Sequence, residues 1–275
     1  MIKRILRNLK ESKLAIISLI LIGILCLACI FAFLSPYDPN KIDLANRLKP
    51  PSLKHLFGTD DMGRDYFTRA LYGGRVSLTV GFSVMIIATA IGTLVGTISG
   101  YLGGIVDSLI MRTLDILMSI PTFFLILILN IYLKPSIWTI VIIISLFSWM
   151  DVARIIRSET LSIKEREYVT CAISQGIPSF KIILTHIVIS VIPSVMVAAS
   201  INVASAILME SSLSFLGLGI QPPNASWGSM LQKAQEYMMD MPTLAVFPGV
   251  LILITVLSFN VLGDLIKESF QGKNV

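Results

Sequence analysis

The chain has 275 residues, of which 55% are hydrophobic and 14% are charged, and its formal net charge is +5. Soluble domains carry about a quarter charged residues, so this composition excludes an ordinary soluble protein and predicts one integral membrane domain. The Lys and Arg residues lie beside apolar stretches, as the flanks of membrane helices do, which argues against binding of nucleic acid.

Six apolar stretches have about the length of membrane helices. A helix needs about 20 apolar residues to cross the hydrocarbon layer, where it satisfies its backbone hydrogen bonds internally. The stretches are residues 14–34, 76–99, 116–133, 135–150, 187–209 and 241–263. The fourth is short, so we expect its helix to continue toward Arg154. The sequence therefore predicts an all-α integral membrane protein with six transmembrane helices.

Basic residues determine the predicted orientation. The head, residues 1–13, is rich in Lys and Arg and is placed in the cytoplasm, and six spans return the tail, residues 268–275, to the same side. The inner segments then hold 13 basic residues and the outer segments hold nine, of which seven lie in residues 35–75. That outer loop opposes the charge rule. The remaining core, residues 76–267, contains an inner loop at 151–186 and an outer loop at 210–240.

The first outer loop ends in a pattern typical of a short helix at the membrane interface. Four apolar residues share one helical face: Tyr66, Phe67, Ala70 and Leu71. Gly73 and Gly74 are expected to end this helix. Three aspartates, at positions 60, 61 and 65, are more typical of helix capping and solvation than of a cation site.

The sequence lacks the motifs of an enzyme or an energy-converting subunit. It contains no GxxxxGK[ST] phosphate-binding loop, no HExxH and no GxSxG, and His55 and His186 are too few and too widely separated for a metal centre. Cys26 and Cys29 lie in an apolar stretch and are interpreted as buried hydrophobes. None of the six stretches contains the ionisable residues that ion-coupled transporters usually need. We therefore expect neither an enzyme nor a self-sufficient secondary transporter, and no cofactor or metal bound by this chain.

The inner loop, residues 151–186, predicts a helix–turn–helix at the membrane surface. Ser162 and Glu165 have the spacing of a capping box that would start the first helix. The apolar face that follows consists of Tyr168, Val169, Ala172 and Ile173. This face can dock onto another subunit or rest on lipid, and the pattern alone fits both.

The predicted turn of this loop is centred on Gly176. Its position suits a left-handed helix cap, and Pro178 prevents simple continuation of the helix. A second short helix is expected from Ser179 to His186, leading into the fifth span.

Small residues mark two spans. Gly92, Gly96 and Gly100 recur every four residues in the second span, which favours close packing against another helix. The fifth span carries a stripe of small, partly polar residues: Ser194, Ala198, Asn202, Ser205 and Met209. This stripe can line a pore shared with a second permease, or it can be a packing seam, which small residues slightly favour.

Residues 166–193, REYVTCAISQGIPSFKIILTHIVISVIP, resemble the EAA loop of bacterial ABC-importer permeases. The positions that match the family pattern are Glu167, Tyr168, Val169, Ala172, Gly176, His186 and Pro193. Thr170 stands where the family usually has the first Glu of the motif, Cys171 replaces an Ala, and Ile189 replaces a Pro. These departures leave the docking fold intact, but Thr170 is uncharged and cannot form a salt bridge in place of that Glu.

Three further segments look like the C-type permeases of oligopeptide, dipeptide and nickel importers. They are GTDDMGRDYFTRALYGGRVSLTVG at 58–81, ESSLSFLGLGIQPPNASWGSML at 210–231 and FPGVLILITVLSFNVLGDLIKE at 247–268. Together with the EAA-like loop they touch most of the chain behind the first span, in the same order as in the family. The resemblance implies the type I ABC-importer permease fold.

The resemblance also implies a multi-subunit machine in the bacterial cell membrane. The partners would be a B-type permease, two ATPase subunits that bind ATP and Mg²⁺, an extracytoplasmic binding protein and membrane lipid. The residues carried over to ATPase docking are Glu167, Tyr168, Val169, Thr170, Ala172, Gly176 and His186. The implied cargo is an oligopeptide or dipeptide, with a nickel or other metal chelate, or an opine, as the alternative.

Overall fold

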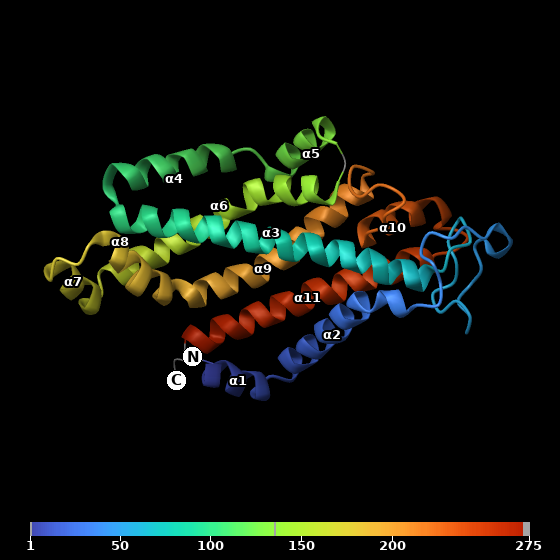
Figure 1. Cartoon of the computed structure of the whole chain (residues 1–275), viewed down its shortest axis with the longest axis horizontal. Helices are drawn as coiled ribbons and strands as arrows, with labels where there is room; N and C mark the ends of the chain where they lie inside the picture. The colour runs from blue at the N-terminus through green and yellow to red at the C-terminus, as the bar shows by residue number, and fades with distance from the viewer. Residues whose placement is uncertain (1, 135, 272–275) are drawn as a thin grey trace.

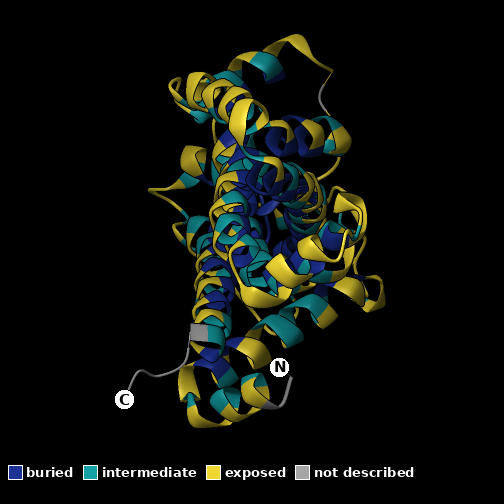
Figure 2. Ribbon diagram, turned by 90° about the vertical axis from the view of Figure 1, so that its left-hand side faces the viewer, coloured by how far each residue is buried: buried dark blue, intermediate teal, exposed yellow. Residues whose placement is uncertain are grey.

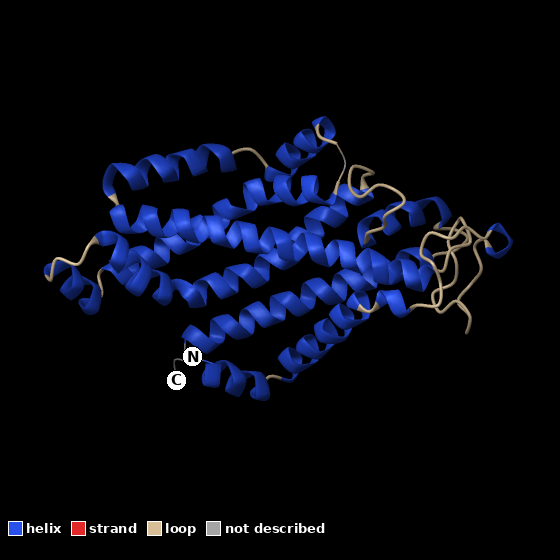
Figure 3. Ribbon diagram, viewed as in Figure 1, coloured by secondary structure: helices blue, strands red, loops and turns tan. Residues whose placement is uncertain are grey.

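The computed structural model describes residues 2–134 and 136–271. Its long helices lie side by side along one axis of the molecule (Figure 1). In the described part of the chain, helices and connecting loops make up the whole fold, and no strand is drawn (Figure 3). The prediction of an all-α membrane protein is confirmed.

Five helical segments are long and apolar enough to cross a membrane. They are α2 (Lys13–Ile30), α3 (Tyr66–Leu102), α6 (Ile137–Lys164), the run Ser179–Phe215 and α11 (Thr243–Gln271). A sixth crossing is formed if α4 (Gly104–Met118) and α5 (Thr122–Tyr132), bent by 76° from each other, are taken as one broken span. The run Ser179–Phe215 comprises α8 (Ser179–Ile182), the turn Ile183–Ile187 and α9 (Val188–Phe215). Shorter helices are α1 (Ile2–Glu11), α7 (Glu167–Ser174) and α10 (Trp227–Ala234).

The third crossing differs from its prediction. A continuous helix was expected over residues 116–133, but α4 begins at Gly104 and ends at Met118, and α5 starts again at Thr122. Pro121 precedes α5, and its missing N–H and its ring prevent α4 from continuing through it. Most of α4 was not predicted, because its charged side chains interrupt the apolar stretch.

The predicted interfacial helix is the first part of α3. Asp65 caps α3, because its carboxylate accepts a hydrogen bond from the Thr68 N–H at 2.7 Å. The helix then runs through Gly73 and Gly74, so the expected stop at these glycines is wrong. A Cβ on Gly74 would lie 2.7 Å from the ring of Trp227. These glycines therefore make room for a close neighbour and leave the helix unbroken.

The closest helix pair is formed by α3 and α6. A Cβ on Gly92 would lie 2.5 Å from the Val152 Cβ, and one on Gly96 would lie 2.5 Å from the Ala153 carbonyl oxygen. The predicted glycine seam is confirmed, because no larger residue fits between these two backbones.

The molecule has two distinct ends. The helices α1 and α7 and the C-terminal part of α11 lie toward one end of its long axis, whereas α10 and the loop that precedes α3 lie at the other (Figure 1). Exposed residues cover the outer surfaces of the helices and buried residues lie between them (Figure 2). Many exposed side chains on the helices are apolar, such as Ile24, Leu109 and Ile142, as expected of a protein whose surroundings are lipid or another apolar subunit.

Candidate coupling loop and translocation path

The loop at one end of the molecule is built around α7. The expected capping box at Ser162 and Glu165 does not start this helix, because α6 continues to Lys164 and Glu165 is its C-terminal cap. The first residue of α7 is Glu167, and its N-cap, Arg166, makes no side-chain capping bond. The Ser-x-x-Glu spacing therefore falls in the last turn of α6.

The end of α7 is a Schellman motif. Gly176 has a φ of +72°, and its N–H donates to the Ile173 carbonyl at 2.9 Å. The Ile177 N–H donates to the Ala172 carbonyl at 3.2 Å, which completes the motif. The predicted left-handed conformation at Gly176 is confirmed, and α8 starts directly after Pro178.

The four apolar residues of α7 do not form one outward face. Val169 and Ala172 are buried and pack in a cluster with residues of α6, α8 and α9. Tyr168 and Ile173 remain 42% and 44% exposed. Val169 and Ala172 therefore anchor the loop to the helical body.

The other residues predicted for docking are either exposed to solvent or lie where the loop joins α9. Glu167, Thr170 and Gly176 are exposed. His186 lies in a π-helical turn, Ile183–Ile187, that joins α8 to α9, and its ring centroid is 6.2 Å from that of Tyr168. The tip of the loop, which contains Glu167, Thr170 and Gly176, is therefore a small exposed surface, and the backbone turn at Gly176 is accessible to a partner.

Most of the stripe on α9 borders a cavity. Four of its five residues line this space, which has a volume of about 200 Å³: Ala198, Asn202, Ser205 and Met209. The opposite wall comes from α5 and α6, with Ile126, Phe147 and Asp151 among its residues. Ser194 does not line the cavity. The stripe is therefore not wholly covered by a packed helix in this chain.

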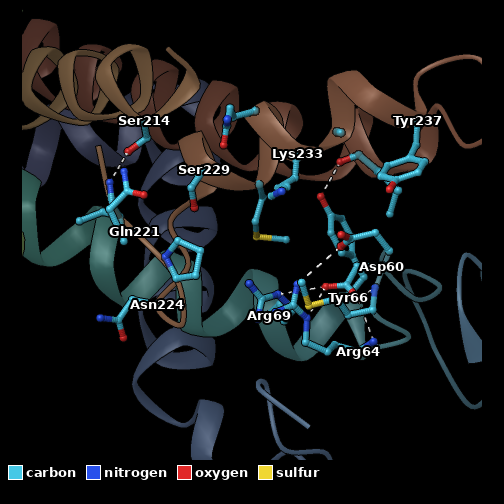
Figure 4. Close-up of a pocket in the computed structure, with 18 of the residues that line it drawn as sticks. Asp60, Arg64, Tyr66, Arg69, Ser214, Gln221, Asn224, Ser229, Lys233 and Tyr237 are labelled. Carbon is cyan, nitrogen blue, oxygen red and sulfur yellow. Dashed lines mark hydrogen bonds and ion pairs between the residues drawn. The ribbon is translucent and has the colours of Figure 1, made fainter. Parts of the chain in front are cut away.

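A second, polar pocket lies at the other end of the molecule, beside the outer loop (Figure 4). It has a volume of about 260 Å³ and lies between the start of α3, α10 and the segments on either side of α10. Asp60 organises one wall, because it accepts hydrogen bonds from the N–H groups of Met62 and Arg64 at 2.9 Å each. Its other oxygen lies 2.7 Å from Arg64 Nε and 3.4 Å from Arg69 Nε.

Asp65 caps a helix, as the sequence indicated, but Asp60 and Asp65 are buried, so the expected solvation is wrong for these two aspartates. Asp60 binds loop backbone and two arginines, and Asp65 caps α3 and lies 2.8 Å from His55 Nδ1. In the described ranges, no group of three or more His, Cys, Asp or Glu side chains is placed to hold a metal ion.

The sequence prediction placed Glu210 wrongly. It was assigned to the outer loop 210–240, but α9 continues to Phe215 and Glu210 is fully buried. Its carboxylate accepts hydrogen bonds from Ser77 Oγ at 3.0 Å and Ser214 Oγ at 2.7 Å. Ser77 Oγ also accepts the Trp227 N–H at 3.3 Å, so this network joins α3, α9 and α10. The only local indication of this network in the sequence is Ser214, four residues after Glu210. The other two members, Ser77 and Trp227, are too far away in the sequence to be predicted as partners.

Comparison with known proteins gives the family. Residues 92–273 match the model of the binding-protein-dependent transport system inner membrane component. Residues 1–51 match the N-terminal transmembrane domain of oligopeptide transport permease C. The chain belongs to this family of ABC-importer permeases. The permease therefore has the type I importer fold and is a multi-pass membrane protein of a multi-subunit transport system.

Curated relatives are similar to the permease over nearly its whole length. A probable D,D-dipeptide transport system permease protein from Escherichia coli is 40% identical, over 96% of this chain and 89% of its own. The oligopeptide transport system permease protein of Bacillus subtilis is 36% identical, over 96% and 87%. The dipeptide transport system permease protein of Alkalihalophilus pseudofirmus is 38% identical, over 97% and 88%.

Proposed function

We propose that this permease carries short peptides into the cell as the C-type subunit of an importer whose energy comes from separate ATPases. The observation that carries the proposal is the α7 loop, a compact turn anchored by Val169 and Ala172 at the end of the molecule that also holds α1. The printed names of the relatives support peptides as the cargo.

The proposed machine contains this chain, a B-type permease, two ATPases and an extracytoplasmic binding protein. The ATPases bind ATP and Mg²⁺, and this chain binds no cofactor. The α7 tip docks onto one ATPase through its exposed residues, with Glu167, Thr170 and Gly176 at the contact. Closure of the ATPase pair then moves the loop, and the buried side of α7 transmits that movement to α6 and α9.

The stripe on α9 is proposed to face the translocation path. It borders a cavity between α5, α6 and α9, and most of its side chains are not sealed by another helix of this chain. In the assembled transporter, the second permease would close this space. The loop that precedes α3 and the pocket of Figure 4 would then face the binding protein.

Reconstitution tests this proposal. The complete transporter in proteoliposomes should accumulate radiolabelled dialanine when ATP and binding protein are supplied, whereas the permease alone should neither hydrolyse ATP nor concentrate the peptide. Unlabelled peptides should compete, and a nickel chelate should not. Concentrative uptake by the permease alone, or competition by the chelate but not by peptides, would contradict it.

A further inference from the structure

Asp151 lies near the middle of α6. It is the fifteenth residue of a 28-residue helix, so at 1.5 Å per residue it lies about 21 Å from the first turn. The sequence placed it at the start of an inner loop, because the apolar stretch ended at Met150. A carboxylate at this depth is costly unless it is paired or faces a water-filled cavity.

The two arginines that follow Asp151 on α6 are paired with aspartates, but Asp151 is not paired in the described part of the chain. Arg154 lies 2.7 Å from an oxygen of Asp115, and Arg157 Nε donates to Asp107 at 2.9 Å. Among the residues that the structure describes, the Asp151 carboxylate has no ion-pair or hydrogen-bonding partner. Its partner must therefore come from outside this chain or from water.

The carboxylate borders the cavity between α5, α6 and α9. Asn202 and Ser205 line the same space from α9. Neither of these side chains makes a hydrogen bond within the described part of the chain. The cavity thus combines one negative charge with an amide and a hydroxyl that are free to bind a ligand.

We propose that this cavity binds the free amino terminus of a peptide. Asp151 accepts hydrogen bonds from the ammonium group, and Asn202 and Ser205 bind the adjacent peptide group. Peptides of different sequence share only their backbone and their charged ends, so a carboxylate aimed at the ammonium recognises all of them. This inference rests on the proposed function and names the part of the cargo that the permease recognises.

The site is incomplete in this chain alone. Its volume of about 200 Å³ is below the roughly 300–1,000 Å³ of typical ligand pockets. The remaining wall comes from the second permease, whose side chains would contact the rest of the peptide.

The test compares two ligands in the complete transporter embedded in nanodiscs, without binding protein. Dialanine carries the ammonium group, and propionyl-alanine has the same skeleton without the amino group. Saturation-transfer NMR measures the binding of each ligand. The variants are Asp151→Asn, Asp151→Glu and the control Glu159→Gln, which removes a carboxylate from α6 outside the cavity.

The wild type and the Glu159→Gln variant should bind dialanine about tenfold more tightly than propionyl-alanine, as expected for one charge-assisted hydrogen bond. Asp151→Asn should abolish this preference, and Asp151→Glu should retain most of it. The subunits of all variants should copurify as the wild type does. Equal binding of both ligands by the wild type, no binding at all, or an unchanged preference in Asp151→Asn would overturn the inference. Loss of the second permease from Asp151→Asn would show that Asp151 pairs with that subunit instead.

Dialanine uptake by the wild type in proteoliposomes is measured in parallel. Failure of that uptake overturns the proposed function together with this inference, whereas normal uptake with no ammonium preference overturns this inference alone.

Discussion

Gly176 has a φ of +72° and no atom within 4 Å of the place where a Cβ would stand. A substitution there changes the backbone preference of the loop without a steric clash inside this chain. A residue with a Cβ pays roughly 1 kcal/mol or more to hold this conformation. The two hydrogen bonds of the Schellman motif depend on the same conformation.

We therefore expect Gly176→Leu to displace the α7 tip while leaving every membrane helix in place. Docking of the ATPases should weaken, and peptide uptake should fall at least tenfold, because the tip no longer presents its turn to the partner. Copurification of the ATPases and uptake in proteoliposomes measure the two effects. Thr170→Glu is the matched control, since Thr170 is exposed on the same helix, α7. Normal docking and uptake in Gly176→Leu would show that this loop is not the coupling element.

Glu210 offers a second test at a single position. Its replacement by Ala would leave the hydroxyl groups of Ser77 and Ser214 without their acceptor and open a cavity between α3, α9 and α10. The expected cost is about 2–4 kcal/mol, which should lower the unfolding temperature of the purified permease by roughly 5 °C or more. Glu236→Ala serves as the control, because that side chain is 56% exposed and its loss should have little effect. Equal melting temperatures for both variants would refute a structural role for the network.

At the scale of helices, the contact between α3 and α6 depends on glycine. Gly96→Val should separate these helices, because even a Cβ would lie 2.5 Å from the Ala153 carbonyl oxygen. Overpacking of this kind costs about 1–3 kcal/mol. Gly23→Val is the matched control in α2, where no atom lies within 4 Å of the added Cβ. Thermal unfolding and the yield of folded protein in detergent should fall for the first variant only, and a similar loss in both would argue against a special role of the seam.

The same scale shows which helices the sequence could predict. Uniform apolar stretches predicted α2, α9 and α11, because a helix surrounded by lipid needs apolar residues on all sides. The helix α4 was missed in most of its length, since it carries Asp107 and Asp115, which pair with arginines of α6. Local hydropathy does not reveal ion pairs between residues of different helices, so it could not predict that α4 lies against α6.

The candidate site was predictable to a similar degree. Gly176 needed only local turn chemistry, and its conformation was correctly expected. The division of α7 into a buried and an exposed side depends on contacts with α6 and α9, so the pattern of Val169 and Ala172 could not reveal which side faces a partner. The partners of Glu210 and the cavity beside Asp151 likewise depend on distant residues meeting in space.

At the scale of the whole molecule, the outer loop before α3 is the one segment that opposes the charge rule. Three of the seven basic residues at 35–75 are engaged in structure: Arg64 and Arg69 pair with Asp60, and Arg75 Nε donates to the Cys29 carbonyl at 2.6 Å. Cations that are paired or hydrogen-bonded in a folded loop attract the inner leaflet less than free ones do. The engagement of these three arginines therefore reduces the opposition of this loop to an outer location.

Labelling of cysteines tests this orientation. Cys171 is exposed on α7, at the end of the molecule that holds α1, whereas positions 40 and 224 are exposed near the opposite end. An impermeant thiol reagent added to intact cells should label Asn40→Cys and Asn224→Cys but should not label Cys171. Inverted membrane vesicles stripped of peripheral subunits should show the reverse pattern, and a Cys171→Ser variant gives the background from Cys26 and Cys29. Labelling of Cys171 from outside intact cells would show that the orientation is the reverse of the predicted one. The α7 loop would then lie on the side of the membrane that has no ATPase.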